Sequence, residues 1–203
     1  HNTVRMLQRD LFSNFAAQNP ASITIYTTPF QKELASAVSA IREVAVAEAR
    51  RTISGSIFDN DGDRHELMLV VAPDYHEIRL NRFTIEAGDS SPRLRSILLE
   101  RSSAKALGLN IGDSLMVEME NGKQFSLTVS GIIHDMSIEH YQFSGKARGY
   151  ISMATLEWMG KQPYYDEIKL LVAANKDNRN HVLYVAGLAR DRVIEPAGFR
   201  VLG

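Results

Sequence analysis

Residues 97–115, ILLERSSAKALGLNIGDSL, form the stretch of sequence that decides the fold. Ile97-Leu98-Leu99 predicts a short strand, and either Ser102 or Ser103 is a candidate cap for a helix of one to two turns. Gly108 stands where glycine commonly ends a helix. The next turn, at Gly112, leads into a hairpin. This order predicts a β-rich unit in the middle of the chain.

The register of that hairpin follows from its apolar positions. Two runs alternate apolar with polar residues: Leu115, Val117 and Met119, then Phe125, Leu127 and Val129. A two-residue Asn121-Gly122 loop would pair Val117 with Ser126 and place the two apolar sets on opposite faces. A three-residue loop with Gly122 left-handed pairs Val117 with Phe125 and gives one shared apolar face. The sequence therefore predicts the three-residue loop.

The sequence before this unit predicts a β-α-β arrangement. Residues 22–27 alternate as a strand does, and Thr28-Pro29-Phe30-Gln31 combines a cap, a proline at the first helical position and a capping box. Residues 44–53 predict the next strand. Asp59–Asp63 is a turn signal, and the apolar run 66–72 predicts a central strand.

The sequence after the unit returns to alternating strands and helices. Ser152 predicts the cap of a short helix over 153–159, and residues 168–173 predict an apolar strand. Asp177 is a candidate cap for a helix over 178–191, and residues 199–202 predict a last short strand. The fold class expected is α+β, a split β-α-β subdomain that carries an inserted β-rich subdomain.

Composition excludes several classes of protein. The 203 residues are 44% apolar and 23% charged, which is typical of a folded domain. Lys and Arg total 23 against 24 Asp and Glu, a balance that argues against nucleic acid as a partner and against a polybasic membrane-surface protein. No cysteine is present, so thiol catalysis, disulfide scaffolds and zinc ribbons are excluded.

No membrane span is expected within the sequence. The longest apolar run, Leu67–Ala72, has six residues, whereas a spanning helix needs about 20. Residues 2–18 place Val4, Leu7, Leu11 and Phe15 on one helical face without a convincing cap. This pattern fits either an ordinary amphipathic helix or the continuation of a longer helix.

Four motifs invite a chemical reading, and each has a simpler explanation. Ser102 and Lys105 match Ser-x-x-Lys, but the partner motifs Ser-Asp-Asn and Lys-Thr-Gly are absent, so a helix cap is favoured. Asp59–Asp63 begins like a calcium loop, yet Arg64 and Val70 stand where glycine and glutamate are required. Gly145-Lys146 lacks the upstream glycine of a phosphate-binding loop.

The fourth motif is a cluster of potential metal ligands: His134, Asp135, Glu139 and His140. Their spacing fits neither His-Glu-x-x-His nor His-x-x-Glu-His, so polar loop residues are favoured. Trp158 and Met159 are expected to be core or subunit-contact residues. The sequence therefore predicts no catalytic residue, no cofactor and no metal site, and the protein is expected not to be an enzyme.

Residues 97–115, together with Phe125–Asp135, resemble the extracytoplasmic domain of FtsX-like ABC transporter permeases, the MacB-type periplasmic core. Tyr150–Leu156 and Glu167–Val172 are similar to later segments of that domain, so the resemblance covers most of the chain in order. Ser152 departs from the family, which often has proline there, and the loop 138–148 has no obvious counterpart.

The resemblance implies a porter-like subdomain, residues 1–88 and 149–203, and a sabre-like β-subdomain, residues 89–148. It also implies flanking transmembrane helices, of which residues 2–18 would continue the first, and chain ends that emerge on the same side. A compliant junction is expected near Gly88–Pro92 and Phe143–Gly149. Two other classes stay open: a soluble or secreted ligand-binding module, and a hydrolase that uses Ser102 and Lys105 or the histidine cluster.

The family's domain carries no catalysis. The implied role is to transmit motion driven by a cytoplasmic ABC ATPase, so as to export a substrate, release a lipoprotein or signal to an envelope partner. The implied partners are a second permease subunit, that ATPase and an envelope protein or lipoprotein. The implied location is the cell membrane, with this domain periplasmic or extracellular.

Overall fold

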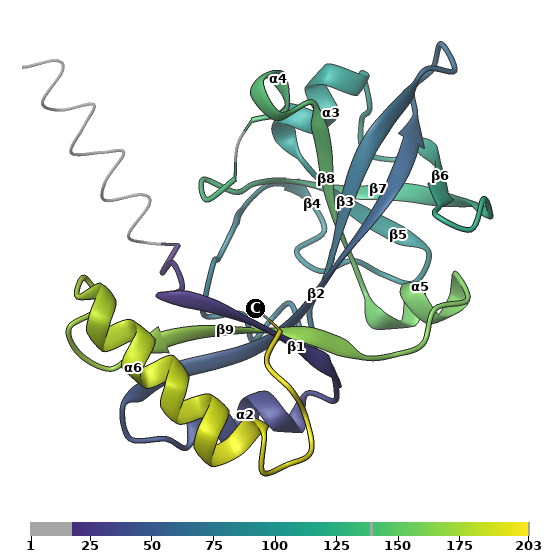
Figure 1. Cartoon of the computed structure of the whole chain (residues 1–203). Helices are drawn as coiled ribbons and strands as arrows, with labels where there is room; N and C mark the ends of the chain where they lie inside the picture. Colours follow the sequence, from purple (N-terminus) through teal and green to yellow (C-terminus); the bar gives the residue numbers. More distant parts are fainter. Residues whose placement is uncertain (1–17, 139, 203) are drawn as a thin grey trace, which may run out of the picture. The chain divides into compact units, whose positions relative to one another are not determined.

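The computed structural model describes residues 18–138 and 140–202, so the predicted helix over 2–17 and Glu139 lie outside the described residues. The fold is mixed α+β, as expected, with many strands and few helices (Figure 1). The chain divides into two compact units. Unit 1 takes its described residues from His1–Ala49, Ile78–Arg82 and Tyr165–Gly203, and unit 2 comprises Arg50–Glu77 and Phe83–Tyr164.

Unit 1 is a small sheet covered by helices. Strand β9 (Tyr165–Val172) lies between β1 (Ile23–Phe30) and the first part of β2 (Val44–Phe58). Ile25 pairs with Ile168 in the antiparallel β1–β9 ladder, and both side chains are buried. Helices α2 (Glu33–Ser39) and α6 (Arg179–Ala189), with the π-helical turn η1 (Arg190–Ile194), bury Val38, Val185 and Ile194.

The helix start predicted at Thr28 is wrong. Strand β1 continues to Phe30, which pairs with Tyr165 of β9, and α2 begins only at Glu33 without a side-chain cap. Pairing with β9 holds β1 extended through Phe30, so Thr28 and Pro29 belong to the strand. This long-range pairing overrides the local capping signal.

Unit 2 is built around a sheet that closes on itself. Its strands follow the order β2-β3-β8-β5-β7, and β6 pairs with both β7 and β2, which completes a ring of six. The remaining strands are β3 (Arg64–Val71), β4 (Thr84–Gly88), β5 (Ser96–Glu100), β6 (Ser114–Met119), β7 (Gln124–His134) and β8 (Lys146–Ile151). Among the described strands of unit 2, the pairs β3–β8 and β5–β7 are parallel and the other pairs are antiparallel. Strand β4 extends the sheet from β7.

Fully buried side chains fill the inside of this ring, as in other small barrels. They come from every strand of the ring and include Ile57, Leu67, Leu69, Ile97, Leu99, Val117, Leu127 and Ile151. Gly149 faces Ile97 so closely that a Cβ atom at Gly149 would lie 2.4 Å from the Ile97 side chain. The interior therefore leaves room only for a glycine at this point of β8.

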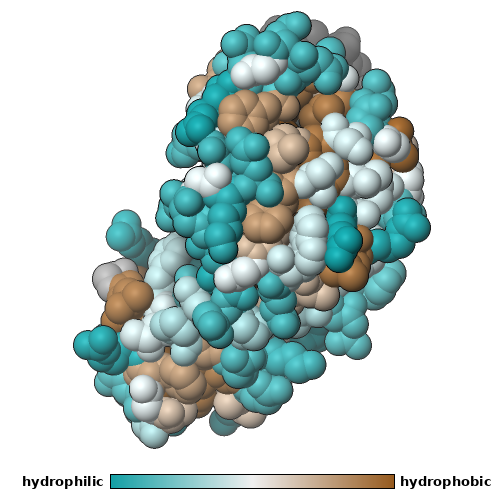
Figure 2. All heavy atoms as spheres, turned by 90° about the vertical axis from the view of Figure 1, so that its right-hand side faces the viewer, coloured by the Kyte–Doolittle hydropathy of each residue, from teal (hydrophilic) through white to brown (hydrophobic). Residues whose placement is uncertain are grey.

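The predicted hairpin register is confirmed. Val117 pairs with Phe125 and Leu115 with Leu127, while Gly122 has φ 81°. The alternative two-residue loop is wrong, because it would have placed the apolar sets on opposite faces. Phe125 lies on the same face of the hairpin as Val117, is partly buried, and packs its ring at 5.3 Å from that of Trp158. Figure 2 shows apolar side chains gathered between hydrophilic ones on this side of unit 2.

Three short helices complete unit 2: α3 (Arg101–Leu107), α4 (Tyr141–Ser144) and α5 (Met153–Trp158). Gly108 ends α3 with φ 65°, and the Ser152 hydroxyl caps α5, both as predicted. The predicted cap of α3 is wrong, because Glu100 rather than Ser102 or Ser103 accepts the capping hydrogen bond. Likewise, Asn178 rather than Asp177 caps α6.

The chain passes between the two units four times, at 49/50, 77/78, 82/83 and 164/165. The first passage lies inside strand β2, and the last lies where β9 begins. Segment 78–82 is the short piece that leaves unit 2 after β3, joins unit 1 and returns before β4. The division into porter-like and sabre-like subdomains with its own boundaries stays a prediction.

Candidate functional site

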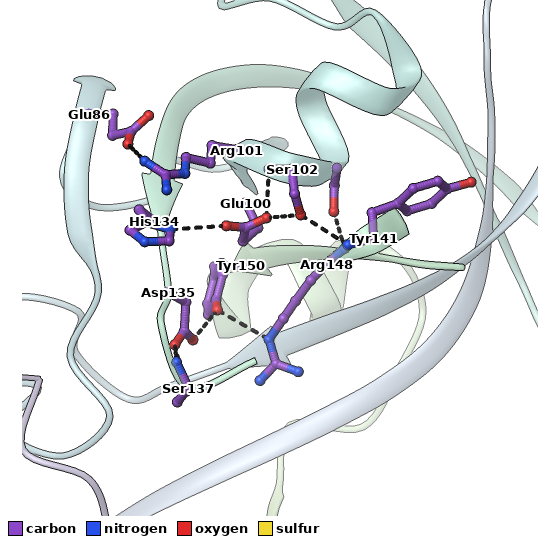
Figure 3. Close-up of polar contacts among 11 residues, drawn as sticks. Glu86, Glu100, Arg101, Ser102, His134, Asp135, Ser137, Tyr141, Arg148 and Tyr150 are labelled. Carbon is purple, nitrogen blue, oxygen red and sulfur yellow. Dashed lines mark hydrogen bonds and ion pairs between the residues drawn. The ribbon is translucent and has the colours of Figure 1, made fainter. Parts of the chain in front are cut away.

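A network of polar side chains lies inside unit 2, where β5, β7 and β8 meet helices α3 and α4 (Figure 3). Five of its members are less than a tenth exposed: Glu100, Ser102, Ser103, Asp135 and Tyr150. Buried polar groups need hydrogen-bond partners, and such networks define one conformation when every member is satisfied. The network is thus the first candidate for a catalytic or binding site in unit 2.

Glu100 is the most buried carboxylate of the network, with 1% of its surface exposed. One of its oxygens accepts hydrogen bonds from the backbone N–H of Ser102, at 2.7 Å, and from the Ser102 hydroxyl. The Ser102 hydroxyl in turn accepts the backbone N–H of Tyr141 at 3.2 Å. Glu100 therefore fixes the start of α3, and Ser102 joins α3 to α4.

This geometry does not assemble the Ser-x-x-Lys arrangement. Lys105 is exposed, and within the described residues no hydrogen bond joins it to Ser102. The Ser102 hydroxyl donates to Glu100, while His134 Nδ1 lies 3.4 Å from the other oxygen of that carboxylate. The carboxylate thus stands between the serine and the histidine, the reverse of the order that nucleophilic catalysis requires. The arrangement positions helices rather than activating a nucleophile.

The proposed metal-ligand cluster is brought together only in part. The rings of His134 and His140 stack with centroids 6.3 Å apart. The Asp135 carboxylate instead accepts a hydrogen bond from Tyr150 (Figure 3). Among residues 18–138 and 140–202, no group of three or more histidine, aspartate or glutamate side chains is placed to hold a metal ion. Glu139 lies outside the described residues.

Asp135 and Tyr150 form the second half of the network. The Tyr150 hydroxyl donates to Asp135 Oδ2 at 2.7 Å and accepts from Arg148 Nε at 3.1 Å. Asp135 Oδ1 accepts the backbone N–H of Ser137 at 2.8 Å. Burial raises the pKa of the Tyr150 phenol well above its ordinary value, so this hydroxyl stays a donor. These contacts fix the turn that follows β7.

The supposed calcium loop serves a structural purpose instead. Asp59 Oδ1 accepts the backbone N–H groups of Asp61 and Asp63 within the turn. Asp59 Oδ2 lies 2.7 Å from His65 Nε2, a hydrogen bond that lowers the pKa of the carboxyl. His65 Nδ1 then contacts the Tyr141 hydroxyl at 2.6 Å. The turn, β3 and α4 are thereby linked.

In unit 1, segment 78–82 is held by an unusual density of polar contacts, and we call it the tie segment. The Glu48 carboxylate accepts the backbone N–H groups of Arg79, at 2.9 Å, and Leu80, at 3.0 Å. Leu80 is fully buried. One carboxylate on β2 therefore anchors two consecutive peptide groups of the segment whose ends both continue into unit 2.

The tie segment is also bound to residues 18–21, where the described chain begins. Asn81 donates its backbone N–H to the Asn19 carbonyl at 3.0 Å, and Arg82 donates to that of Gln18 at 2.8 Å. The Asn81 side chain accepts the backbone N–H of Ala21 at 2.9 Å. The Asn19 side chain donates to the Arg79 carbonyl at 2.8 Å. Any displacement of residues 18–21 is therefore resisted by the tie segment.

A second anchor lies in unit 2 beside the passage at 164/165. The Arg51 guanidinium donates to the Gln162 carbonyl at 2.6 Å and stacks over the Tyr164 ring at 3.7 Å. Only 6% of Arg51 is exposed. Arginine suits this position because its planar fork can bind a carbonyl and stack on an aromatic face at once. The end of unit 2 is thus tied to the strand that enters it.

Sequence reasoning missed most of these residues, namely Glu48, Arg51, His65, Asn81, Glu100 and Tyr150. Their partners lie far away in the sequence, as Glu48 and Leu80 do, so no spacing reveals them. The one local signal was Glu100, which stands at the end of an apolar strand and just before a helix, where a carboxylate can cap.

None of the helices within the described residues is both long and apolar enough to cross a bilayer. No model of a known protein family matches the sequence, and no curated protein matches it either. Solved structures do match it in fold, among them two with TM-scores above 0.5.

The extracellular domain of the noncanonical ABC-type transporter YknZ from Gram-positive bacteria matches with a TM-score of 0.59 and 12% identity, over 89% of this chain and 100% of that one. The periplasmic region of MacB from Actinobacillus actinomycetemcomitans matches with a TM-score of 0.54 and 13% identity, over 89% and 87% of the two chains. The resemblance predicted from the sequence is confirmed at the level of fold. The chain has the mixed α+β fold of extracytoplasmic domains of ABC-type transporter permeases.

Proposed function

We propose that this chain is a non-catalytic extracytoplasmic domain of an ABC transporter permease. It transmits ATP-driven motion of membrane helices to export a substrate, release a lipoprotein or signal to an envelope partner. The observation that carries the proposal is the match in fold, along nearly the whole chain, to the extracellular domain of YknZ and the periplasmic region of MacB. The order of segments in the sequence supports it independently.

The proposal includes partners and a location. The domain works with a second permease subunit and, through membrane helices, with a cytoplasmic ABC ATPase. It lies on the periplasmic or extracellular side of the cell membrane. The two parts of the domain in this proposal are the porter-like part, residues 1–88 and 149–203, and the sabre-like part, residues 89–148.

The tie segment supports a mechanical role. A device that transmits motion needs stiff bodies and firm attachment at the points where force enters. Four hydrogen bonds attach residues 18–21 to residues 79–82, and Glu48 attaches the same segment to β2. A force applied at residue 18 is therefore passed to the tie segment, both ends of which continue into unit 2.

The test uses the complete gene product in its native membrane. Because the chain has no cysteine, single cysteines at the exposed positions Leu94 and Phe143 can be labelled selectively. The expected result is labelling of intact cells by a membrane-impermeant maleimide, together with co-purification of an ATPase. The turnover of this ATPase should fall when Glu48, which anchors the tie segment to β2, is replaced by alanine. Labelling only after the cells are broken would contradict the proposal.

A further inference from the structure

One end of unit 1 gathers a basic and apolar patch that the polar contacts above do not explain. A depression of about 350 Å³ is lined there by Ser22, Ile23, Lys176, Asp177, Arg179, Val182 and Leu183. The patch lies where β1 begins and where the loop after β9 enters α6. Figure 1 shows the starts of β1 and α6 at this same end of the unit.

The apolar part of the patch consists of two neighbouring exposed side chains. Leu183 is 49% exposed and Tyr184, its neighbour on α6, is 56% exposed, whereas the inward face of the helix buries Val182, Val185 and Ala189. The Tyr184 ring lies 6.3 Å from that of His181. A leucine and a tyrosine side by side on the outer face of a helix form an exposed apolar patch, and such patches commonly mark a site of interaction.

The charged part of the patch carries mainly positive charge. Lys176 and Arg179 are both exposed, and Asp177 is the single carboxylate among the residues that line the depression. Cations that flank an exposed leucine and tyrosine match the interface of an anionic bilayer, where aromatic rings and aliphatic chains enter the headgroup layer and cations meet phosphates. The chemistry therefore fits a lipid surface.

The path of the chain points to the same partner. Residues 18–22 lead directly into the start of β1. Residues 200–202 run antiparallel to β1, with Thr28 N–H donating to the Arg200 carbonyl and Leu202 N–H to that of Tyr26. The described chain therefore enters unit 1 at the end that carries the patch and, in its last residues, runs back toward that end.

From these observations, and resting on the proposed function, we infer that Lys176, Arg179, Leu183 and Tyr184 form a bilayer-contact surface that seats unit 1 on anionic lipid headgroups. If membrane helices adjoin both ends of the described chain, this end of unit 1 faces the bilayer. The surface then fixes the tilt of unit 1 while membrane helices move beside it. Each contact is weak, but the flanking helices hold the surface at high effective concentration next to the lipid.

The first test locates the patch relative to lipid. Cysteine replaces Leu183, or Leu94 as a control at 57% exposure in unit 2, and carries an environment-sensitive fluorophore. The chain is attached through an amino-terminal polyhistidine to vesicles that contain brominated phosphatidylglycerol. Quenching at position 183 and little at position 94 is expected. Equal quenching at both positions, or none at 183, would overturn the inference.

The second test measures charge and apolar contact separately on vesicles with and without phosphatidylglycerol. Lys176→Gln with Arg179→Gln should weaken partitioning about fivefold for each cation, and Leu183→Ser with Tyr184→Ser should weaken it on both lipids. The matched control is Lys105→Gln with Lys123→Gln, both exposed in unit 2, which should partition as the unchanged chain does. All these side chains are exposed, so circular dichroism and thermal melting should be unaltered.

Three outcomes separate this inference from the proposed function and from a dimer interface. If the gene product spans the membrane but the probe at position 183 is not quenched, the lipid surface is wrong and the permease role stands. If the patch variants abolish a dimer in sedimentation and leave partitioning unchanged, the patch instead binds a second copy. If no membrane-spanning segments flank the domain, the permease role fails whatever the vesicles show.

Discussion

Asn81 donates its backbone N–H to the carbonyl of Asn19 at 3.0 Å, and both residues adopt left-handed backbone conformations, with φ 51° and 52°. Asparagine tolerates this region better than most residues with a side chain. At both positions asparagine allows the left-handed turn, and its side chain also hydrogen-bonds to the other segment. It joins the first described residues to the tie segment.

Asn81→Ala should loosen this junction. The change removes the acceptor for the Ala21 N–H and leaves an alanine in the left-handed conformation. The free energy of unfolding of unit 1 should therefore fall by about 1–2 kcal/mol. Hydrogen exchange should report faster exchange at Ala21, with chemical denaturation giving the stability. Asn81→Asp keeps both the acceptor and the backbone preference and serves as the control. Unchanged exchange at Ala21 in the alanine variant would refute the expectation.

The sequence alone predicts the elements whose contacts are local. The β6–β7 register followed from side-chain alternation alone, because a shift by one residue would turn the apolar set of one strand outward. The endings at Gly108 and Ser152 were also predicted, since a left-handed glycine and a capping serine act within one turn of helix.

The sequence does not predict what distant contacts decide. Strand β1 overrides the capping signal at Thr28 because β9, more than a hundred residues later, supplies its ladder. The passage between units at 49/50 lies inside the continuous strand β2 and has no linker composition to mark it. The network around Glu100 and Tyr150 likewise joins five elements through contacts between residues far apart in the sequence.

Tyr150→Phe should alter both stability and its dependence on pH. The variant leaves Asp135, itself 4% exposed, without the phenol donor, at a cost of about 1–3 kcal/mol near neutral pH. The folded pKa of Tyr150 lies well above 10.0, its ordinary value. The stability that the neutral phenol contributes is therefore complete below pH 10 and is lost as the pH rises through the folded pKa.

The difference in unfolding free energy between the native chain and Tyr150→Phe should thus shrink above pH 10. Urea denaturation at a series of alkaline pH values measures it. Tyr26→Phe, at an exposed tyrosine in unit 1, should show neither the neutral loss nor the alkaline change. A difference that stays constant up to the highest pH at which the chain folds would count against the buried hydrogen bond.

Gly131→Ala should separate β4 from β7. A Cβ atom there would lie 2.6 Å from the Asp89 carbonyl oxygen and 2.8 Å from the Leu98 side chain. Because the backbone of Asp89 cannot move aside as the end of a flexible side chain can, we expect the free energy of unfolding to fall by about 1–3 kcal/mol. Protection of the Asp89 N–H, which bonds to the Ser130 carbonyl at 2.9 Å, should fall in hydrogen exchange. Gly187→Ala, whose added Cβ would meet only the Arg190 side chain at 3.9 Å, should leave that protection intact.

Substitutions at Arg95 should separate the cost of its strained backbone from the benefit of its side-chain contact with Trp158. It has φ 60°, held by a hydrogen bond from its N–H to the buried Thr155 hydroxyl at 3.0 Å. Its guanidinium lies 4.7 Å from the centre of the Trp158 ring. Arg95→Ala keeps the strained conformation and loses the cation–π contact, so stability should fall by about 0.5–1 kcal/mol.

Arg95→Gly loses the same contact but removes the cost of a side chain at positive φ, about 1–2 kcal/mol. The glycine variant should therefore be at least as stable as the native chain and clearly more stable than the alanine variant. Thermal melting of the two variants side by side measures the difference. Equal melting temperatures would mean that Thr155 does not hold the left-handed conformation, because a relaxed backbone would erase the advantage of glycine.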